Sequence, residues 1–397
     1  MNDQISDVDR LVKAFLSTLA IIITIGLIMV WSASFILASE IFGSSLHYII
    51  RQLVYLSLSL GVAFVVSRTK YNFWIKYGYI INIAASSIVA LTIIKGIGSS
   101  AKGASRWLSF GGMSIQPGEI VKFTVILSAL SFFENWNKMD GKERLKHGGS
   151  LFFPLALLIK QPDFGSFSIC FVVISFVCFM SSFPRRYFYY SLVSGGVVGV
   201  CVLFSQAYRV KRMLTYLDPW KNPQGSGFQI IQSYMAFANG AAFGQGLGNS
   251  NEKLFYLPEA HNDFIFSVIG EELGFIGVFL IICLFIAFIY FGFKLVLQVA
   301  DRVGIILGSA VVFVLGLQAL LNMGVVLGLL PTKGLNLPFI SYGGSSLICN
   351  FFGIGLLLSV VKGYRDQLHE ELGFHGDGNQ NKYHDIEGRE DIKELYV

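Results

Sequence analysis

The residues of this sequence that could do chemistry gather in four polar segments between long apolar runs. Glu119 and Lys122 are three residues apart, which places them on one face of a helix. This pair has two interpretations, a salt bridge where a helix begins or part of a binding site. Lys160 and Asp163 bracket a Gln-Pro turn, and a tight turn does not need two opposite charges at the edge of an apolar run. Both pairs are therefore candidates for function.

The other two segments contribute a carboxylate and a further lysine. Asp263 directly precedes an apolar run, so it either caps a helix or acts as an acid or base. Lys333 lies in the Pro- and Gly-rich stretch 328–346, which is typical of a re-entrant or capping loop. The glycine-rich stretch 240–248 follows no predicted strand and is no dinucleotide fingerprint. It indicates instead a close approach of the backbone to a bulky ligand or a neighbouring helix.

Together these residue types suit a lipid-linked phosphate. Arg106, Lys122 and Lys160 could hold a pyrophosphate group while a carboxylate removes a proton from a hydroxyl group. An ion-coupled transporter with buried charge pairs fits the same residue types. The six histidines and five cysteines show no metal-ligand spacing, so no structural metal is predicted.

The elements that must position these residues are transmembrane helices. Of the 397 residues, 54% are hydrophobic and 14% are charged, with a mean hydropathy of +0.61, whereas soluble domains carry about 25% charged residues. This composition excludes a single soluble core, a disordered chain and a disulfide scaffold. Ten apolar runs predict an all-α polytopic membrane protein with ten transmembrane helices. The runs lie near residues 13–37, 48–66, 75–95, 118–134, 150–160, 165–183, 186–206, 264–292, 304–326 and 342–361.

The distribution of Lys and Arg predicts the orientation. With the N-terminus inside, the inner loops hold more cations than the short outer loops, as the positive-inside rule requires. Both termini are therefore predicted to be cytoplasmic, which needs an even number of spans. The net charge of +5 is modest and spread over many loops, which argues against a nucleic-acid partner.

The longest connection, about residues 207–263, lies between the seventh and eighth runs and is predicted to be extracytoplasmic. Within it, 208–217 mixes basic and apolar residues like a helix among lipid head groups, and 227–238 has apolar residues at helical spacing. We divide the chain into a transmembrane domain, 1–361, and a flexible cytoplasmic tail, 362–397.

Five motifs carry a resemblance to a known family: RWLSFGGMSIQPGEIVKF, KQPDFGS, GFQIIQSYMAFANGAAFGQGLGNS, LPEAHNDFIFSVIGEELGFIG and LPTKGLNLPFISYGGSS. On these motifs, which follow the family's order, the chain resembles the SEDS family (FtsW/RodA/SpoVE), ten-helix membrane proteins of cell-wall synthesis. The resemblance covers residues 13 to 365. Residues 331–334 resemble the division branch, FtsW, rather than the elongation branch, RodA.

The resemblance implies a peptidoglycan glycosyltransferase of the bacterial cell membrane, which polymerises lipid II for the division septum. It implies that Asp263 is the catalytic carboxylate, which deprotonates the acceptor 4-hydroxyl for attack at C1 of the donor. The β-1,4 linkage would form by inversion, with undecaprenyl pyrophosphate as the leaving group. The substrate-binding residues expected on this resemblance are Arg106, Glu119, Lys122, Lys160, Asp163 and Lys333.

The resemblance also implies partners, namely a class B penicillin-binding protein, held through the eighth and ninth helices and the outer loops, and other membrane proteins of the divisome. A divalent cation, Mg or Mn, could assist departure of the pyrophosphate, although no ligand set in the sequence defines a site. Two other functions stay open, a lipid II flippase and a scaffold for the penicillin-binding protein without catalysis of its own. Gln318 and Asn322, one turn apart in the ninth run, are expected to contact a neighbouring helix or the cavity.

Two departures from the family pattern concern the long loop. Asn262 stands where the family often has Thr, and Ala241 and Ala242 stand where a second glycine and a bulkier residue are common. Neither removes a charged group that the reaction needs, so they bear on the positioning of the loop and not on the class of reaction.

Overall fold

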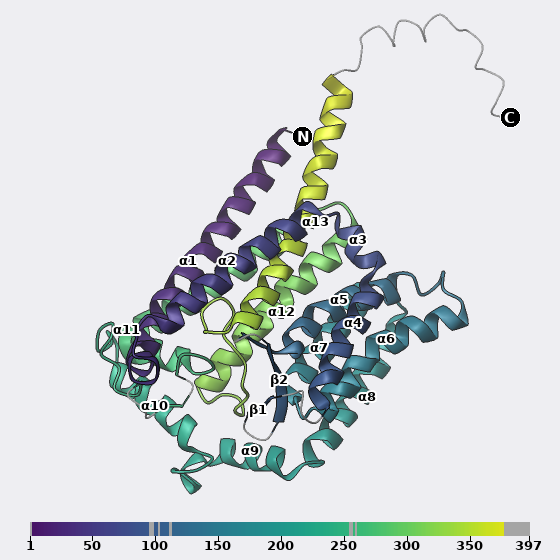
Figure 1. Ribbon diagram of the computed structural model, residues 1–397. Helices are drawn as coiled ribbons and strands as arrows, with labels where there is room; N and C mark the ends of the chain where they lie inside the picture. Colours follow the sequence, from purple (N-terminus) through teal and green to yellow (C-terminus); the bar gives the residue numbers. More distant parts are fainter. Residues whose placement is uncertain are drawn as a thin grey trace, which may run out of the picture.

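In the computed structural model, residues 2–94, 99–101, 104–110, 113–253, 257–258 and 260–376 are described. Long helices form an elongated bundle (Figure 1). The helices are α1 (Asn2–Phe42), α2 (His47–Arg68), α3 (Tyr71–Lys76), α4 (Gly78–Ile93), α5 (Pro117–Glu134), α6 (Gly141–Lys160), α7 (Phe164–Met180), α8 (Arg185–Phe204), α9 (Ala207–Leu217), α10 (Phe228–Gly240), α11 (Ile265–Val296), α12 (Arg302–Val326) and α13 (Gly344–Gly376).

Each of the ten predicted apolar runs coincides with one of these helices. Among the described residues, α1, α2, α11, α12 and α13 each contain a segment long and apolar enough to cross a membrane, so the chain is a multi-pass membrane protein. The apolar helices α4 and α7 have only 16 and 17 residues, below the roughly 20 that a bilayer core needs. Helix α5 is buried along almost its whole length and contacts α4, α6, α7, α12 and α13, so it forms the centre of the bundle.

A small antiparallel sheet of three strands corrects the all-α prediction. Its strands are β1 (Ser99–Ala101), β2 (Ala104–Phe110) and β3 (Met113–Ile115), in the order β1-β2-β3. Phe110 pairs with Met113 across a Gly-Gly dipeptide, which is typical of tight hairpins. The paired segments 108–110 and 113–115 each alternate apolar, polar and apolar residues, a period that fits a strand and not a helix.

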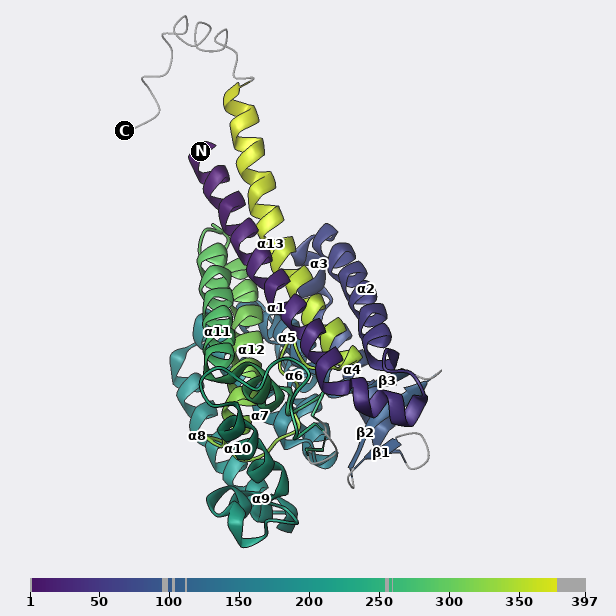
Figure 2. The ribbon, with the colours of Figure 1, turned by 90° about the vertical axis from the view of Figure 1, so that its left-hand side faces the viewer.

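The long connection contains the two predicted helices, which are confirmed as α9 and α10. A short 3-10 turn, Pro219–Lys221, separates them. In both views α9 lies at the opposite end of the molecule from the N-terminal end of α1 and the C-terminal end of α13 (Figures 1 and 2).

The two described chain ends lie side by side, where Arg365 contacts Asp9 at 3.4 Å. Helix α13 continues to Gly376, so the first part of the predicted tail, 362–376, is helical. Seven of the eleven residues 362–372 are Lys, Arg, Gln, Glu or Leu, which favour helices, and Leu368 is buried. Residues 377–397 of the predicted tail lie outside the described residues.

Helix α11 is interrupted at Gly274, which has a φ of +67°. Four backbone hydrogen bonds to the loop after α10 replace helical ones that the break removes. These are Gln245 N to Glu271 O (2.9 Å), Gly246 N to Glu272 O (3.0 Å), Phe275 N to Ala241 O (2.9 Å) and Ile276 N to Ala242 O (3.2 Å). A Cβ atom at Gly240 or Gly244 would collide with the α11 backbone. Of the two interpretations of the glycine-rich stretch, close approach to a neighbouring helix is therefore confirmed.

Candidate functional site

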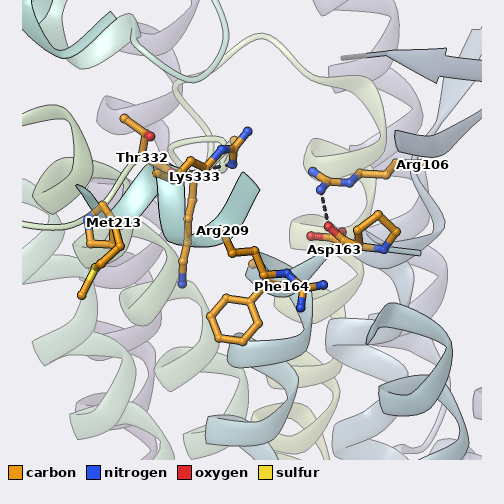
Figure 3. Close-up of a pocket in the computed structure, with 12 residues that line it drawn as sticks. Arg106, Asp163, Phe164, Arg209, Met213, Thr332 and Lys333 are labelled. Carbon is orange, nitrogen blue, oxygen red and sulfur yellow. Dashed lines mark hydrogen bonds between the residues drawn. The ribbon is translucent and has the colours of Figure 1, made fainter. Parts of the chain in front are cut away.

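Four segments that are distant in the sequence converge on one cavity, which we call the arginine cavity (Figure 3). They are strand β2, the turn between α6 and α7, helix α9 and the connection between α12 and α13. The cavity volume is about 70 Å³. Its lining residues are Arg106, Pro162, Asp163, Phe164, Gly165, Arg209, Arg212, Met213, Pro331, Thr332, Lys333 and Gly334. Three of the seven predicted site residues, Arg106, Asp163 and Lys333, thus come together.

Asp163 is held rigidly at the start of α7. Its carboxylate accepts hydrogen bonds from the backbone N–H of Ser166 at 3.2 Å and from the Ser166 hydroxyl at 2.7 Å, so it caps the helix. Only 5% of the residue is exposed. Arg106 reaches the same turn from β2 and donates to the carbonyl of Pro162 (Figure 3). The missed sheet therefore brings Arg106 to the cavity.

The arginine cavity is strongly positive, because its lining holds four cations and one carboxylate. Lys333 Nζ lies 5.3 Å from the centre of the Phe164 ring, and the Arg209 guanidinium lies 5.8 Å from the same ring. Burial lowers the pKa of Lys333, and the negative charge of Asp163 acts in the opposite direction. A cavity of this charge suits an anionic group such as a phosphate.

Two of the four cations, Arg209 and Arg212, were missed as site residues. They are three residues apart on α9, so they share a face, and that spacing was the available signal. Arg212 donates to the carbonyl of Thr332 at 3.4 Å, and Tyr216 donates to the carbonyl of Leu329 at 3.0 Å. Both bonds fasten α9 to the connection between α12 and α13, so this helix closes one side of the cavity.

Asp263 lies just before α11, in a segment whose backbone is fixed at three successive carbonyl groups. The carbonyls of His261, Asn262 and Asp263 accept hydrogen bonds from Tyr342 N (3.0 Å), Ser341 Oγ (2.7 Å) and Asn322 Nδ2 (2.8 Å). Asp263 is partly exposed. A Cβ atom at Gly334, which lines the arginine cavity, would lie 2.9 Å from Asp263 Oδ2. Asp263 therefore borders the cavity without being one of its lining residues.

Asn322 and Gln318 make the polar contacts predicted for them. The Asn322 side chain bridges two parts of the site, because it donates to the carbonyls of both Asp263 and Leu335. Gln318 accepts a hydrogen bond from Lys122 at 3.0 Å. One face of α12 thus supports both the segment that carries Asp263 and the centre of the bundle.

Glu119 and Lys122 form a buried ion pair in α5. Lys122 Nζ lies 2.7 Å from each carboxylate oxygen of Glu119, and their side chains are 1% and 7% exposed, respectively. Neither residue lines the arginine cavity, although a Cβ atom at Gly118 would come within 3.3 Å of Asp163 Oδ2. The pair therefore lies close to Asp163, with the geometry of a salt bridge near the start of a helix, and a role in substrate binding stays a prediction.

Lys160 is the last residue of α6 and is exposed, and it is not among the residues that line the cavity. Its predicted role in binding also stays a prediction. The described part of the chain holds no group of three or more His, Cys, Asp or Glu side chains that could bind a metal. Asp163 shares the cavity with four cations and Asp263 only borders it, which does not fit a Mg or Mn site. In the arginine cavity, three arginine side chains and one lysine side chain supply the positive charge.

Comparison with known proteins agrees with this arrangement. Residues 12–366 match the family model described as cell cycle protein, FtsW/RodA/SpoVE. A probable peptidoglycan glycosyltransferase FtsW of Geobacter metallireducens is 41% identical over 343 residues, which cover 84% of this chain and 90% of that protein.

Two solved structures share the fold. A chain of a peptidoglycan synthase complex that coordinates polymerization and crosslinking superposes with a TM-score of 0.70 at 28% identity, covering 88% of this chain and 97% of that one. The crystal structure of the rod shape determining protein RodA of Thermus thermophilus gives a TM-score of 0.63 at 25% identity, with 88% and 96% covered. With the family match over nearly all of the described residues, these likenesses show that the chain belongs to the FtsW/RodA/SpoVE family of membrane proteins.

Proposed function

We propose that this protein is a peptidoglycan glycosyltransferase that polymerises lipid II into β-1,4 glycan strands for septal cell-wall synthesis. One observation carries the proposal: Asp263 lies in a segment whose backbone is fixed by three hydrogen bonds, and it borders a cavity lined by four cations. A carboxylate beside a positive cavity provides a base next to a place for a pyrophosphate. The name of the Geobacter relative and the synthase complex support the same activity.

In the proposed reaction Asp263 acts as the general base. Its carboxylate takes the proton of the acceptor 4-hydroxyl while that oxygen attacks C1 of the donor sugar. The bond from C1 to the pyrophosphate oxygen breaks, the configuration at C1 inverts, and undecaprenyl pyrophosphate leaves with the bonding electrons. Arg106, Arg212 and Lys333 stabilise the negative charge that develops on the leaving group. Asp263 then passes its proton to solvent.

The size of the arginine cavity limits what it holds. Its volume of about 70 Å³ is well below the roughly 300–1,000 Å³ of sites that enclose a whole small molecule. We infer that it receives only the charged pyrophosphate, while the sugars and the lipid chain lie outside it. Asp263, at the border of the cavity, then faces the bond between sugar and phosphate.

The topology that we propose has ten crossing helices, namely α1, α2, α4, α5, α6, α7, α8, α11, α12 and α13. Both termini are cytoplasmic, and residues 207–263 lie outside the cell membrane, at the division septum. The contact between Arg365 and Asp9, which places both described ends on one face, supports an even number of crossings. We keep the division into a transmembrane domain, 1–361, and a C-terminal extension, 362–397, of which α13 forms the first part.

As partners we propose a class B penicillin-binding protein and other divisome membrane proteins. The similar chain comes from a complex that both polymerises and crosslinks. Helix α11, the eighth proposed crossing, exposes a stripe of large apolar side chains that suits a membrane-embedded partner helix. The stripe consists of Phe275, Ile276, Phe279 and Leu280.

Polymerisation of lipid II by the purified protein with its transpeptidase partner tests the proposal. We expect Asp263→Asn to lower the rate at least about 100-fold, the smallest usual contribution of a general base. Asp218→Asn is the matched control, because Asp218 lies in the same long loop and does not line the cavity. Its activity should stay at the wild-type level.

Three outcomes separate the proposed reaction from the other functions. Glycan polymer made by Asp263→Asn at the wild-type rate would rule out Asp263 as the base. Translocation of labelled lipid II in vesicles, with no polymer under any condition, would point to a flippase. Normal cell division with the Asp263→Asn protein would point to a scaffold.

A further inference from the structure

A second and larger cavity opens between α3, α5 and α6, and we call it the lysine cavity. Its volume is about 310 Å³, within the range of sites that bind small molecules, about 300–1,000 Å³. Its lining residues are Ile75, Lys76, Tyr79, Ser131, Asn135, Lys138, Met139, Glu143 and His147. None of them belongs to the arginine cavity or to the proposed reaction.

The lysine cavity lies on the face of the molecule that carries the described chain ends. Helix α6 begins at this cavity and ends just before the turn that lines the arginine cavity, and its 20 residues span about 30 Å, the thickness of a bilayer core. A line of contacts connects the chain ends to the lysine cavity across this face. It runs through Arg365–Asp9 (3.4 Å), Tyr71–Asp301 (2.8 Å), Arg302–Met180 (3.4 Å) and Ser182–Glu134 (2.9 Å). In the proposed topology this is the cytoplasmic face.

The charges of the lysine cavity favour an anion. Lys76 and Lys138 approach it from two different segments, and both are exposed at the cavity rim. Lys146 lies next to it, with Nζ 3.0 Å from the Tyr79 hydroxyl. The one acidic lining residue, Glu143, accepts a hydrogen bond from the backbone N–H of Asp140 at 3.3 Å in a capping box.

Neutral hydrogen-bonding groups line the inner part of the lysine cavity. His147 Nδ1 lies 3.3 Å from the hydroxyl of Ser131, which is buried, and the Asn135 side chain donates to the carbonyl of Ser131 at 3.1 Å. Lysines at the rim and hydroxyl, amide and imidazole groups within are the donor set that recognises a phosphate ester.

Apolar side chains around the lysine cavity decide between a lipid and a soluble phosphate. Phe73, Tyr77 and Ile80, from α3 and the start of α4, are 51%, 38% and 47% exposed, and Leu145 of α6 is 78% exposed. These side chains place the cavity beside the lipid-facing surface, where a phosphate that is attached to acyl chains can enter the cavity while its chains lie against them. Basic pockets on the cytoplasmic side of membrane proteins are typical sites for anionic head groups.

We propose that the lysine cavity binds the head group of an anionic phospholipid of the cytoplasmic leaflet. The phosphate lies between Lys76 and Lys138, and the acyl chains lie against the exposed side chains of α3 and α4. This site is separate from the substrate site and does not depend on the proposed reaction.

Binding of dioleoyl phosphatidylglycerol to the delipidated full-length protein, measured by native mass spectrometry, tests the proposal. We expect this lipid to bind at least about fivefold more tightly than dioleoyl phosphatidylcholine, since each lysine near an anionic lipid surface contributes about 1 kcal/mol, or about fivefold. The double variant Lys76→Gln/Lys138→Gln should lose about 25-fold in affinity for phosphatidylglycerol. Both lysines are exposed, so we expect the double variant to fold, and size-exclusion chromatography checks this.

The matched control is Lys142→Gln/Lys362→Gln, which removes two cations of the same face that do not line the cavity. The affinity of this control variant for phosphatidylglycerol should fall by less than about twofold. An equal loss in the control would overturn the proposal in favour of diffuse surface charge. Inorganic phosphate that displaces phosphatidylglycerol at equal concentration would overturn the choice of a lipid in favour of a soluble phosphate.

Discussion

Two buried ion pairs of nearly equal geometry have very different positions in the fold. Lys122 and Glu119 are 2.7 Å apart within one turn of α5, and Lys253 and Glu272 are 2.8 Å apart between a loop and α11. Both pairs are almost fully buried. The first pair lies within one helix, where the three-residue spacing brings its members together. The second pair joins a loop residue to a helix residue 19 positions later, a spacing that predicts no contact.

The surroundings of the second pair show its structural role. Ser32 of α1 donates to the Glu272 carboxylate at 2.6–2.7 Å, so three segments meet at this one residue. Lys253 begins the stretch that leads to Asp263, ten residues later. The pair in α5 therefore places two opposite charges close to the site. The pair at α11 anchors the loop that carries the proposed base.

The largest effect is expected for Lys253→Met. Removal of one partner leaves Glu272 as an unpaired buried charge, which costs about 3–5 kcal/mol. The melting temperature in detergent should fall sharply, and the double variant Lys253→Met/Glu272→Leu should recover much of the loss. An unchanged melting temperature in the single variant would mean that the pair does not anchor the loop.

Lys122→Met should destabilise the protein less than Lys253→Met. The amide group of Gln318, which now accepts from Lys122, can rotate to donate to Glu119 and so compensate part of the lost charge. A double-mutant cycle with Gln318→Leu measures this compensation. The two substitutions should be more destabilising together than the sum of their separate effects, and simple additivity would contradict the idea.

The smallest effect concerns Glu252, the neighbour of Lys253. Burial and the negative charge of Glu271 raise the pKa of Glu252 to about 7 from 4.5. The native state therefore holds a proton that the unfolded state has lost, so this residue makes stability fall as the pH rises from about 4.5 to 7. Glu252→Gln should remove that decrease.

Melting temperatures of wild type and Glu252→Gln at pH 5 and pH 8 check this prediction. The melting temperature of the variant should be higher than that of the wild type at pH 8, and the two melting temperatures should differ little at pH 5. A difference that is the same at both pH values would show that Glu252 does not titrate in this range.

The sequence predicted the pair in α5 because a three-residue spacing defines one face of a helix. It could not predict the pair at α11, since Lys253 and Glu272 are separated by a turn and a helix start whose geometry follows no period. The sequence could group Arg106, Asp163 and Lys333, because all three lie in connections predicted for the same side of the membrane. It could not predict which residues of that side meet in one cavity, because this depends on the fold.

Residues that the sequence missed, or that lie apart from the cavity, have local reasons for their positions. Arg212 was interpreted as a head-group contact, because an amphipathic basic helix is typical of a membrane surface, yet the same helix folds back over the site. Lys160 was grouped with Asp163 because the two residues are three positions apart in the sequence. Lys160 is the last residue of α6, and it is exposed. The strand that carries Arg106 was missed because two apolar residues, Trp107 and Leu108, follow Arg106 and break the alternation that marks a strand.

The backbone hydrogen bonds between α11 and the loop after α10 limit how this protein can be rebuilt from its relatives. The carbonyls of Glu271 and Glu272 and the amides of Phe275 and Ile276 find partners only in 241–246 among the described contacts. A chimaera that exchanges the long loop alone would bring a foreign backbone to these four groups. Loop and helix are therefore one unit of exchange, from about residue 207 to 296.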